Sequence, residues 1–316
     1  MSFDLAALRT AVQCHGRVAR VVIAAAQGSA PREAGAAMLV WADGQSGTIG
    51  GGALEHAATK TARAALQNES PDALTRCPLG PSLGQCCGGA VTLVTQIYDT
   101  ARLAQIDPSA PVLRRIDGPQ DPPLALLREM RQARGAGVAP PVRVLDGWLL
   151  EPMAHPDRAL WIWGAGHVGR ALVAVLSPLP DLAITWIDTG RDRFPGTVPD
   201  GVTILVAADP ARALPHAPRD AHHLILTYSH ALDLDLCHAA LSHGFASAGL
   251  IGSATKWARF RKRLTALGHT RERIDTLTCP IGDPALGKHP QAIAVSVAAA
   301  LLSPAQSTKA RIGDRA

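Results

Sequence analysis

Residues 159–175 read ALWIWGAGHVGRALVAV, and this stretch decides the fold of the C-terminal half of the chain. An apolar run up to Trp163 is followed by Gly164, Gly166 and Gly169 in G-x-G-x-x-G spacing, and then by a helical pattern of Ala, Leu and Val. The pattern predicts a strand, a tight turn and the start of a helix. Glycines let such a turn approach a ligand closely, and the first amides of the helix can bind a phosphate.

A second apolar run follows that helix and ends in Asp188, where dinucleotide-binding folds place the carboxylate that binds ribose. Further strands and helices alternate beyond it, which favours a doubly wound parallel sheet of the Rossmann type. The expected strands are Leu182–Ile187, Val202–Ala207, His223–Thr227 and Phe245–Ile251, and the expected helices are Ala231–Ser242, Ser253–Leu267 and Pro290–Leu302.

Polar residues follow several of these strands, and ligands of open parallel sheets bind at the carboxyl ends of the strands. The candidates there are Asp188, Thr227, Ser229, His230, Gly252, Ser253 and Lys256. The histidines also have simpler interpretations: His167 could merely fill a variable position of the glycine turn, and His230 could act only at the helix start. Ser253 is also predicted to cap the helix that follows it.

The N-terminal half predicts a mixed α/β domain with strands at Val18–Ala26, Ala36–Ala42, Ser46–Ile49, Asp72–Pro78 and Ala90–Tyr98. Gly50, Gly51 and Gly52 open a helix that is expected to run to about Leu66. Their amides are a second candidate site for an anion, although a glycine loop required only for tight packing is the alternative.

Cys86 and Cys87 are adjacent within the glycine-rich stretch LGPSLGQCCGG, residues 79–89. Backbone amides of such a loop can lower a thiol pKa and favour the thiolate, which binds a soft metal or accepts sulfur. The simpler interpretation is that these cysteines are small buried hydrophobic residues. No C-x-x-C pair accompanies them, which argues against a tetrahedral zinc site. We expect all six cysteines of the chain to be free thiols.

Length and composition limit the remaining possibilities. A chain of 316 residues favours two domains, which we place at residues 1–152 and 159–302, with a linker at Glu151–Arg158 and a disordered tail at 303–316. Only 4% of residues are aromatic, and the net charge of +5 includes no dense Lys/Arg run, so nucleic acid is not an expected partner.

No signal sequence or membrane-spanning apolar run is evident, so we expect a cytoplasmic protein without membrane attachment. The hydrolase motifs G-x-S-x-G, Walker A and H-E-x-x-H are absent.

Together these motifs resemble the XdhC family, accessory factors of xanthine dehydrogenase maturation in purine catabolism. The resemblance extends from about residue 15 to 302. The motifs that carry it are Gly28-Ser-Ala-Pro-Arg32, Gly47-Thr-Ile-Gly-Gly-Gly52, Leu83-Gly-Gln-Cys-Cys-Gly-Gly89, Gly164-Ala-Gly-His-Val-Gly169, Thr227 to Asp233, Gly249-Leu-Ile-Gly-Ser253 and Cys279-Pro-Ile-Gly282.

The resemblance implies an XdhC/CoxI-like N-terminal domain and a Rossmann-like C-terminal domain. It implies a carrier without turnover that binds molybdenum cofactor (Mo-molybdopterin) as cargo, protects it during sulfuration and delivers it to xanthine dehydrogenase. A cysteine desulfurase, cofactor biosynthesis proteins and a second copy of the chain are the other implied partners. The glycines of the turn would hold the phosphate, and Cys86 or Cys87 would approach the molybdenum or its sulfur.

The alternative is an NAD-dependent oxidoreductase, in which the same glycine turn and Asp188 would bind the adenosine ribose. No proton donor paired with a substrate-anchoring arginine supports this alternative, and the cysteine loop would have no role in it.

Overall fold

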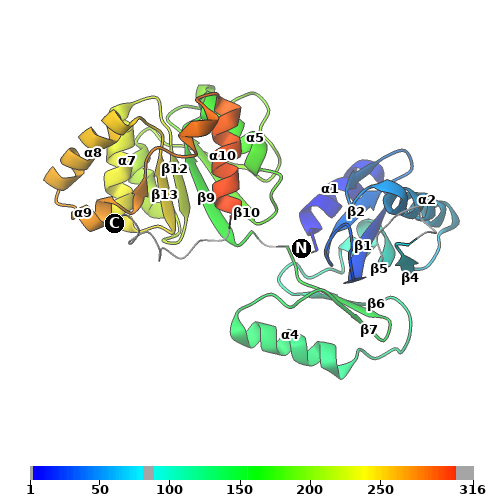
Figure 1. Cartoon of the computed structure of the whole chain (residues 1–316). Helices are drawn as coiled ribbons and strands as arrows, with labels where there is room; N and C mark the ends of the chain where they lie inside the picture. The colour runs from blue at the N-terminus through cyan, green and yellow to red at the C-terminus, as the bar shows by residue number, and fades with distance from the viewer. Residues whose placement is uncertain (1–2, 81–88, 155, 304–316) are drawn as a thin grey trace, which may run out of the picture. The chain divides into compact units, whose positions relative to one another are not determined.

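The computed structural model describes residues 3–80, 89–154 and 156–303. The chain divides into two compact units, residues 1–154 and 155–316 (Figure 1). Every sheet and every buried apolar cluster lies within one of the two units.

A five-stranded antiparallel sheet in the order β3-β2-β1-β5-β4 forms the centre of the N-terminal unit. In β1, Val21 and Ile23 face one side of the sheet, and Val22 and Ala24 face the other, because side chains alternate along a strand. Both sides are therefore covered. The strands are β1 (Val18–Gln27), β2 (Ala37–Val40), β3 (Gln45–Gly47), β4 (Ala73–Pro78) and β5 (Ala90–Tyr98).

Helix α2 (Gly52–Asn68) covers the first side of this sheet and confirms the helix predicted after the three glycines. Its buried residues Leu54, Ala58 and Ala62 recur at helical spacing and pack in the same cluster as Ile23. Two further helices, α1 (Leu5–His15) and α3 (Thr100–Leu103), begin after the capping residues Asp4 and Asp99, which accept hydrogen bonds from amides of the first turn.

The second side of the sheet meets a smaller antiparallel sheet in the order β6-β8-β7, whose Leu149 packs with Val22 and Val94. The dipeptide Asp146-Gly147, a sequence typical of tight hairpins, joins two antiparallel strands of this sheet, and both residues have positive φ, at 48° and 78°. The segments are β6 (Val112–Arg115), β7 (Arg143–Leu145), β8 (Trp148–Glu151) and the helix α4 (Leu124–Ala136).

Our assignment of Glu151 to an exposed linker is wrong. Glu151 ends β8 and is fully buried, and its carboxylate forms a bidentate ion pair with Arg20 at 2.7 and 2.9 Å. Arg114 pairs with the same carboxylate. Burial alone would raise the pKa of Glu151, but the two guanidinium groups outweigh it and lower the pKa. Two prolines follow Glu151 in the sequence and suggested a linker. Glu151 is buried because its carboxylate pairs with Arg20 and Arg114, which are distant in sequence.

The C-terminal unit is a six-stranded parallel sheet in the order β11-β10-β9-β12-β13-β14, with helices on both faces (Figure 1). This confirms the predicted α/β fold class with a doubly wound, Rossmann-like C-terminal sheet. The strands are β9 (Arg158–Trp163), β10 (Leu182–Asp188), β11 (Thr203–Val206), β12 (His222–Ile225), β13 (Ser247–Leu250) and β14 (Leu277–Thr278).

Strand β9 is buried on both faces: Leu160 and Ile162 belong to one apolar cluster, and Trp161 and Trp163 belong to the other. The first cluster includes α5 (His167–Leu176) and α10 (Pro290–Leu302). The second includes α7 (His230–His243), α8 (Ala254–Ala266) and α9 (Arg271–Ile274). Short helix α6 (Pro210–Ala213) follows β11.

Among the elements that the sequence pattern did not indicate are the four-residue strand β6 and the two-residue strand β14. Both are short, and β14 is defined only by its pairing with β13. The predicted tail from residue 304 onward lies outside the described residues. None of the helices in the described ranges has the length and apolar character needed to cross a membrane.

Candidate functional site

The three glycines of the turn after β9 have different surroundings. Gly164 has φ of +127°, and a Cβ atom there would overlap the carbonyl oxygen of Leu226. A Cβ atom at Gly169 would overlap the carbonyl oxygen of Gly164. Gly166 is exposed, and no atom of the described residues lies within 4 Å of the place where its Cβ would be. Two glycines therefore allow close packing, and Gly166 leaves its side of the turn open to a ligand.

Helix α5 begins directly after Gly166, and in the described structure no side chain caps its first turn. The first turn also has no acidic residue, so its amides keep the partial positive charge of a helix N-terminus. His167 is exposed at the first position of the helix, which is compatible with either of its two interpretations. This end of α5 can bind an anion such as phosphate.

Asp188 ends β10 and is tied to the glycine turn. Its Oδ2 accepts a hydrogen bond of 2.6 Å from the amide of Ala165, and its Oδ1 accepts one of 2.7 Å from the amide of Thr189. The carboxyl group is buried, and Arg193 Nε lies 3.5 Å from Oδ1. Asp188 therefore supports the backbone of the turn, in addition to any role toward a ligand.

Two residues near the turn were missed by our sequence analysis. The guanidinium of Arg193 lies 4.6 Å from the centre of the Tyr228 ring, and Tyr228 is 65% exposed. This pair joins the segment after β10 to the segment after β12. The chain has only two tyrosines, and Tyr228 directly follows the predicted strand His223–Thr227, which is the signal that could have indicated it.

A buried ion pair lies at the carboxyl ends of β12 and β13. Asp233 is fully buried and accepts hydrogen bonds from the amide and hydroxyl of Thr227, at 2.9 and 2.7 Å. Lys256 Nζ lies 2.6 Å from Asp233 Oδ2 and donates to the carbonyl of Ile251 at 2.9 Å. The two partners are 23 positions apart along the chain, so no local sequence pattern links Asp233 to Lys256.

Four of the predicted residues lie around that ion pair, namely Ser229, His230, Gly252 and Ser253. Ser229 and Ser253 cap α7 and α8 by accepting from the amides of Leu232 and Lys256, which confirms the predicted cap at Ser253. His230 is the exposed first residue of α7. A Cβ atom at Gly252 would lie 2.8 Å from Lys256 Cδ and 3.5 Å from Cys279 Sγ.

The triple-glycine loop of the N-terminal unit binds a carboxylate of its own chain. Glu55 Oε2 accepts hydrogen bonds of 3.0 Å from the amides of Ile49 and Gly51, and the Thr48 hydroxyl oxygen accepts one of 3.0 Å from the amide of Gly50. Burial would raise the pKa of Glu55, but the hydrogen bonds from Thr48, Gly51 and Ile49 lower it. An external anion at Gly50, Gly51 and Gly52 would therefore compete with Glu55.

The model of the XdhC Rossmann domain matches residues 160–301, and the model of the XdhC and CoxI family matches residues 11–76. The first match lies in the C-terminal unit of the structure and the second in the N-terminal unit. The chain belongs to the XdhC family.

Relatives of this XdhC chain include the uncharacterized protein YqeB of Escherichia coli K12, which is 26% identical over 282 residues. The match covers 87% of this chain and 41% of YqeB, so the chain spans about two fifths of the length of that relative. A crystal structure named as a xanthine dehydrogenase from Bacillus halodurans covers 95% of both chains with a TM-score of 0.70 and 21% identity, which supports the fold. A Veillonella parvula short-chain dehydrogenase/reductase in complex with NADP covers 43% of this chain and 61% of its own, at 15% identity and a TM-score of 0.26, too low to support an argument.

Cys86 and Cys87 of this XdhC protein lie outside the described residues. The free thiols of the described part are Cys14, Cys77, Cys237 and Cys279. Burial raises the pKa of Cys237 and Cys279, and the Lys256 ammonium opposes this effect at both thiols.

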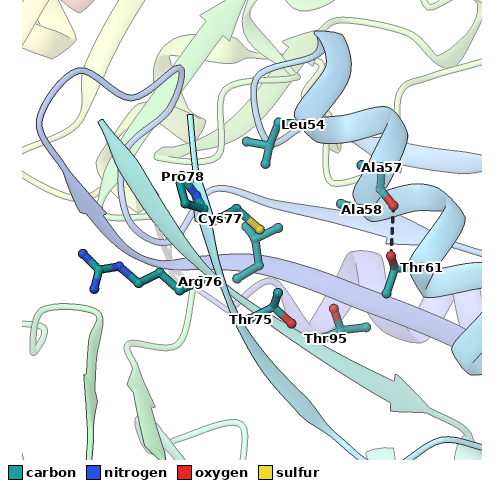
Figure 2. A pocket seen from close by; sticks show the side chains of 10 residues that line it. Leu54, Ala57, Ala58, Thr61, Thr75, Arg76, Cys77, Pro78 and Thr95 are labelled. Atoms are coloured by element: carbon teal, nitrogen blue, oxygen red, sulfur yellow. Dashed lines mark hydrogen bonds between the residues drawn. The ribbon is translucent and has the colours of Figure 1, made fainter. Parts of the chain in front are cut away.

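A cavity of about 270 Å³ lies between α2 and the strands β4 and β5. Figure 2 shows the Cys77 sulfur among the side chains that line it. Burial raises the pKa of Cys77, so this thiol is less reactive than an exposed one. This cavity could not be predicted from the sequence, because its lining residues come from three elements that are separate along the chain.

Proposed function

We propose that this protein binds molybdenum cofactor as cargo, protects it during sulfuration and delivers it to xanthine dehydrogenase. Membership of the XdhC family supports a role in xanthine dehydrogenase maturation. The open side of the turn at Gly166 supports the binding of a phosphate-containing ligand such as molybdenum cofactor. Molybdopterin carries a terminal phosphate, and the uncapped amides at the start of α5 supply a place for it.

The protein acts as a carrier in this proposal and needs no catalytic residue. Gly164 and Gly169 keep the turn compact, Gly166 admits the phosphate, and Asp188 holds the Ala165 amide in place. Cys86 and Cys87 remain the proposed contacts on the metal side. Cysteine desulfurase, cofactor biosynthesis proteins and a second copy of the chain are proposed partners.

An NAD-dependent oxidoreductase would share the order of the parallel strands and an acidic residue at the end of β10. In this chain both oxygens of that acid already accept backbone hydrogen bonds from Ala165 and Thr189. A ribose would therefore have to share the carboxylate with the turn, which favours the carrier proposal.

Binding is tested by incubating the purified full chain with anaerobic molybdenum cofactor and, separately, with NAD. Each mixture is passed through a desalting column, and molybdenum, pterin fluorescence and NAD absorbance are measured in the protein fraction. We expect cofactor to be retained and NAD to be lost. Retention of NAD without cofactor would replace the carrier proposal with the oxidoreductase.

Delivery is tested in a deletion strain. A carrier acts after cofactor synthesis, so total cofactor and nitrate reductase activity should stay unchanged while xanthine dehydrogenase is assembled without molybdenum. The specificity comes from a contact surface matched to one client protein. Loss of both activities would point to cofactor synthesis, and a molybdenum-filled dehydrogenase would contradict the delivery proposal.

A further inference from the structure

A cavity of about 430 Å³ lies in the N-terminal unit, between the end of β5, helix α3 and strand β6. Pockets that bind small molecules span roughly 300–1,000 Å³, so the volume suits a small organic ligand. Three arginines, Arg102, Arg114 and Arg115, line the cavity together with Tyr98. The proposed phosphate site at Gly166 belongs to the other unit, so these arginines have no part in it.

The arginines belong to a network in which positive charges outnumber negative ones. Arg102 pairs with Asp72, and its Nη1 lies 2.7 Å from Asp72 Oδ1. Arg114 shares the buried Glu151 carboxylate with Arg20, whose side chain is 3% exposed. Three guanidinium groups are therefore paired with two carboxylates. One positive charge of this network has no counterion among the described residues.

Arg114 is the most buried of the arginines that line the cavity. Its side chain is 12% exposed, and taking an ion out of water costs free energy that a counterion must offset. Its Nη1 donates to the Tyr98 hydroxyl, and burial raises the pKa of Tyr98, so this partner is neutral near pH 7. Its Nε is buried and has no acceptor in the described part of the chain. An additional anion would therefore stabilise this guanidinium.

Arg115 adds an exposed guanidinium with free donors. It donates only to the carbonyl oxygen of Gly118, from Nε at 3.1 Å and from Nη2 at 2.7 Å. A guanidinium has five N–H donors, so the two on Nη1 remain available to a ligand. Asp107 also lines the cavity, but its Oδ1 accepts from the amide and hydroxyl of Ser109. Asp107 balances Arg115 in charge, and the surplus of one positive charge remains.

We propose that this cavity binds a small organic acid, whose single carboxylate supplies the missing negative charge. Guanidinium groups bind carboxylates in a planar, bidentate geometry. A single negative charge balances the network, which favours a carboxylate over a phosphate dianion. Ile106, Pro111 and Val112 also line the cavity and contact the carbon atoms of the acid. This site goes beyond the proposed function and does not depend on molybdenum cofactor.

The test measures the affinity of the purified full chain for sodium hexanoate, hexanamide and inorganic phosphate by isothermal titration calorimetry at constant ionic strength. Hexanamide has the shape of hexanoate without its charge. Arg114→Gln removes the surplus charge, and Arg115→Gln removes the exposed guanidinium. Arg128→Gln is the matched control, because Arg128 is exposed on α4 of the same unit. Circular dichroism and urea unfolding establish that each variant is folded.

We expect the parent chain to bind hexanoate with a Kd of about 1 mM or lower, and at least about tenfold more tightly than hexanamide or inorganic phosphate. Arg114→Gln and Arg115→Gln should each weaken hexanoate binding by about fivefold or more, and Arg128→Gln should match the parent. If Arg114→Gln does not fold, Arg115→Gln and the comparison with hexanamide decide.

Equal affinities for hexanoate and hexanamide, or unchanged hexanoate binding by a folded test variant, would overturn the site. Tighter binding of inorganic phosphate than of hexanoate would overturn the choice of a carboxylate. Retention of molybdenum cofactor is measured separately, so each of these outcomes leaves the carrier proposal unchanged.

Discussion

The Asp188 carboxylate accepts a hydrogen bond of 2.6 Å from the amide of Ala165, the residue between the first two glycines of the turn. This contact connects the end of β10 to the glycine turn. It gives a buried acid at this position a structural task that is independent of any ribose. The turn is therefore fixed by β10 as well as by β9, the strand that it follows.

Replacing Asp188 with Asn tests this task. The amide group of Asn offers one acceptor oxygen where two backbone amides, those of Ala165 and Thr189, now donate. We expect a loss of about 1–3 kcal/mol in the free energy of unfolding, because a buried amide is left without its acceptor. Urea unfolding measures the change, with exposed Asp200→Asn as the control. Unchanged stability would show that Asp188 is free to serve a ligand alone.

Gly166→Asp should abolish cofactor retention and leave the fold intact. A Cβ atom there meets no described atom within 4 Å, so the substitution is sterically free in the protein. The added carboxylate would occupy the open side of the turn and repel a phosphate. Retention on a desalting column and circular dichroism are the measurements. Gly135→Asp is the control, since Gly135 is exposed, equally uncrowded and in the other unit.

The double change of Cys86 and Cys87 to Ser tests the thiols of the glycine-rich loop. Serine has a similar volume but replaces an ionisable, soft sulfur with a hard hydroxyl. Under our proposal the affinity for molybdenum cofactor decreases, and Cys14→Ser, on an exposed site, has no effect. Normal binding and delivery by the double variant would contradict the assignment of these thiols to the metal side.

The buried imidazole of His223 predicts a pH dependence of stability. Burial and then the nearby His243 and His222 lower its pKa from 6.5 to about 4, and its Nδ1 accepts from Trp163 Nε1 at 3.1 Å. The unfolded chain takes up a proton near pH 6.5, whereas the folded chain does so only near pH 4. Stability is therefore lost as the pH falls through this window, by up to roughly 3 kcal/mol.

His223→Gln is the variant for this prediction, because Gln can still accept from Trp163 and does not titrate. Urea unfolding at pH 7, 5.5 and 4.5 should show a smaller decrease for His223→Gln than for the parent chain. His289→Gln, at an exposed position, should follow the parent. An identical decrease in all three proteins would assign the pH dependence to other groups.

The sequence by itself determined the fold class of the C-terminal unit and the position of its glycine turn. Local physics is sufficient there: an apolar run with both faces buried predicts a parallel strand, and glycine spacing predicts the turn and the helix start. The hairpin at Asp146 and Gly147 and the cap at Ser253 were predictable for the same reason, because each depends on residues close together in the chain.

Only the tertiary structure decided which polar residues meet. Glu151 is buried because Arg20, distant in sequence, reaches its carboxylate, and Asp233 is buried because Lys256 does the same. Strand order brings Cys279 beside Gly252, although no local pattern links them. Hydrophobic periodicity specifies which face of an element is buried, but the partner of a buried charge depends on pairing between distant strands, which a single sequence does not encode locally.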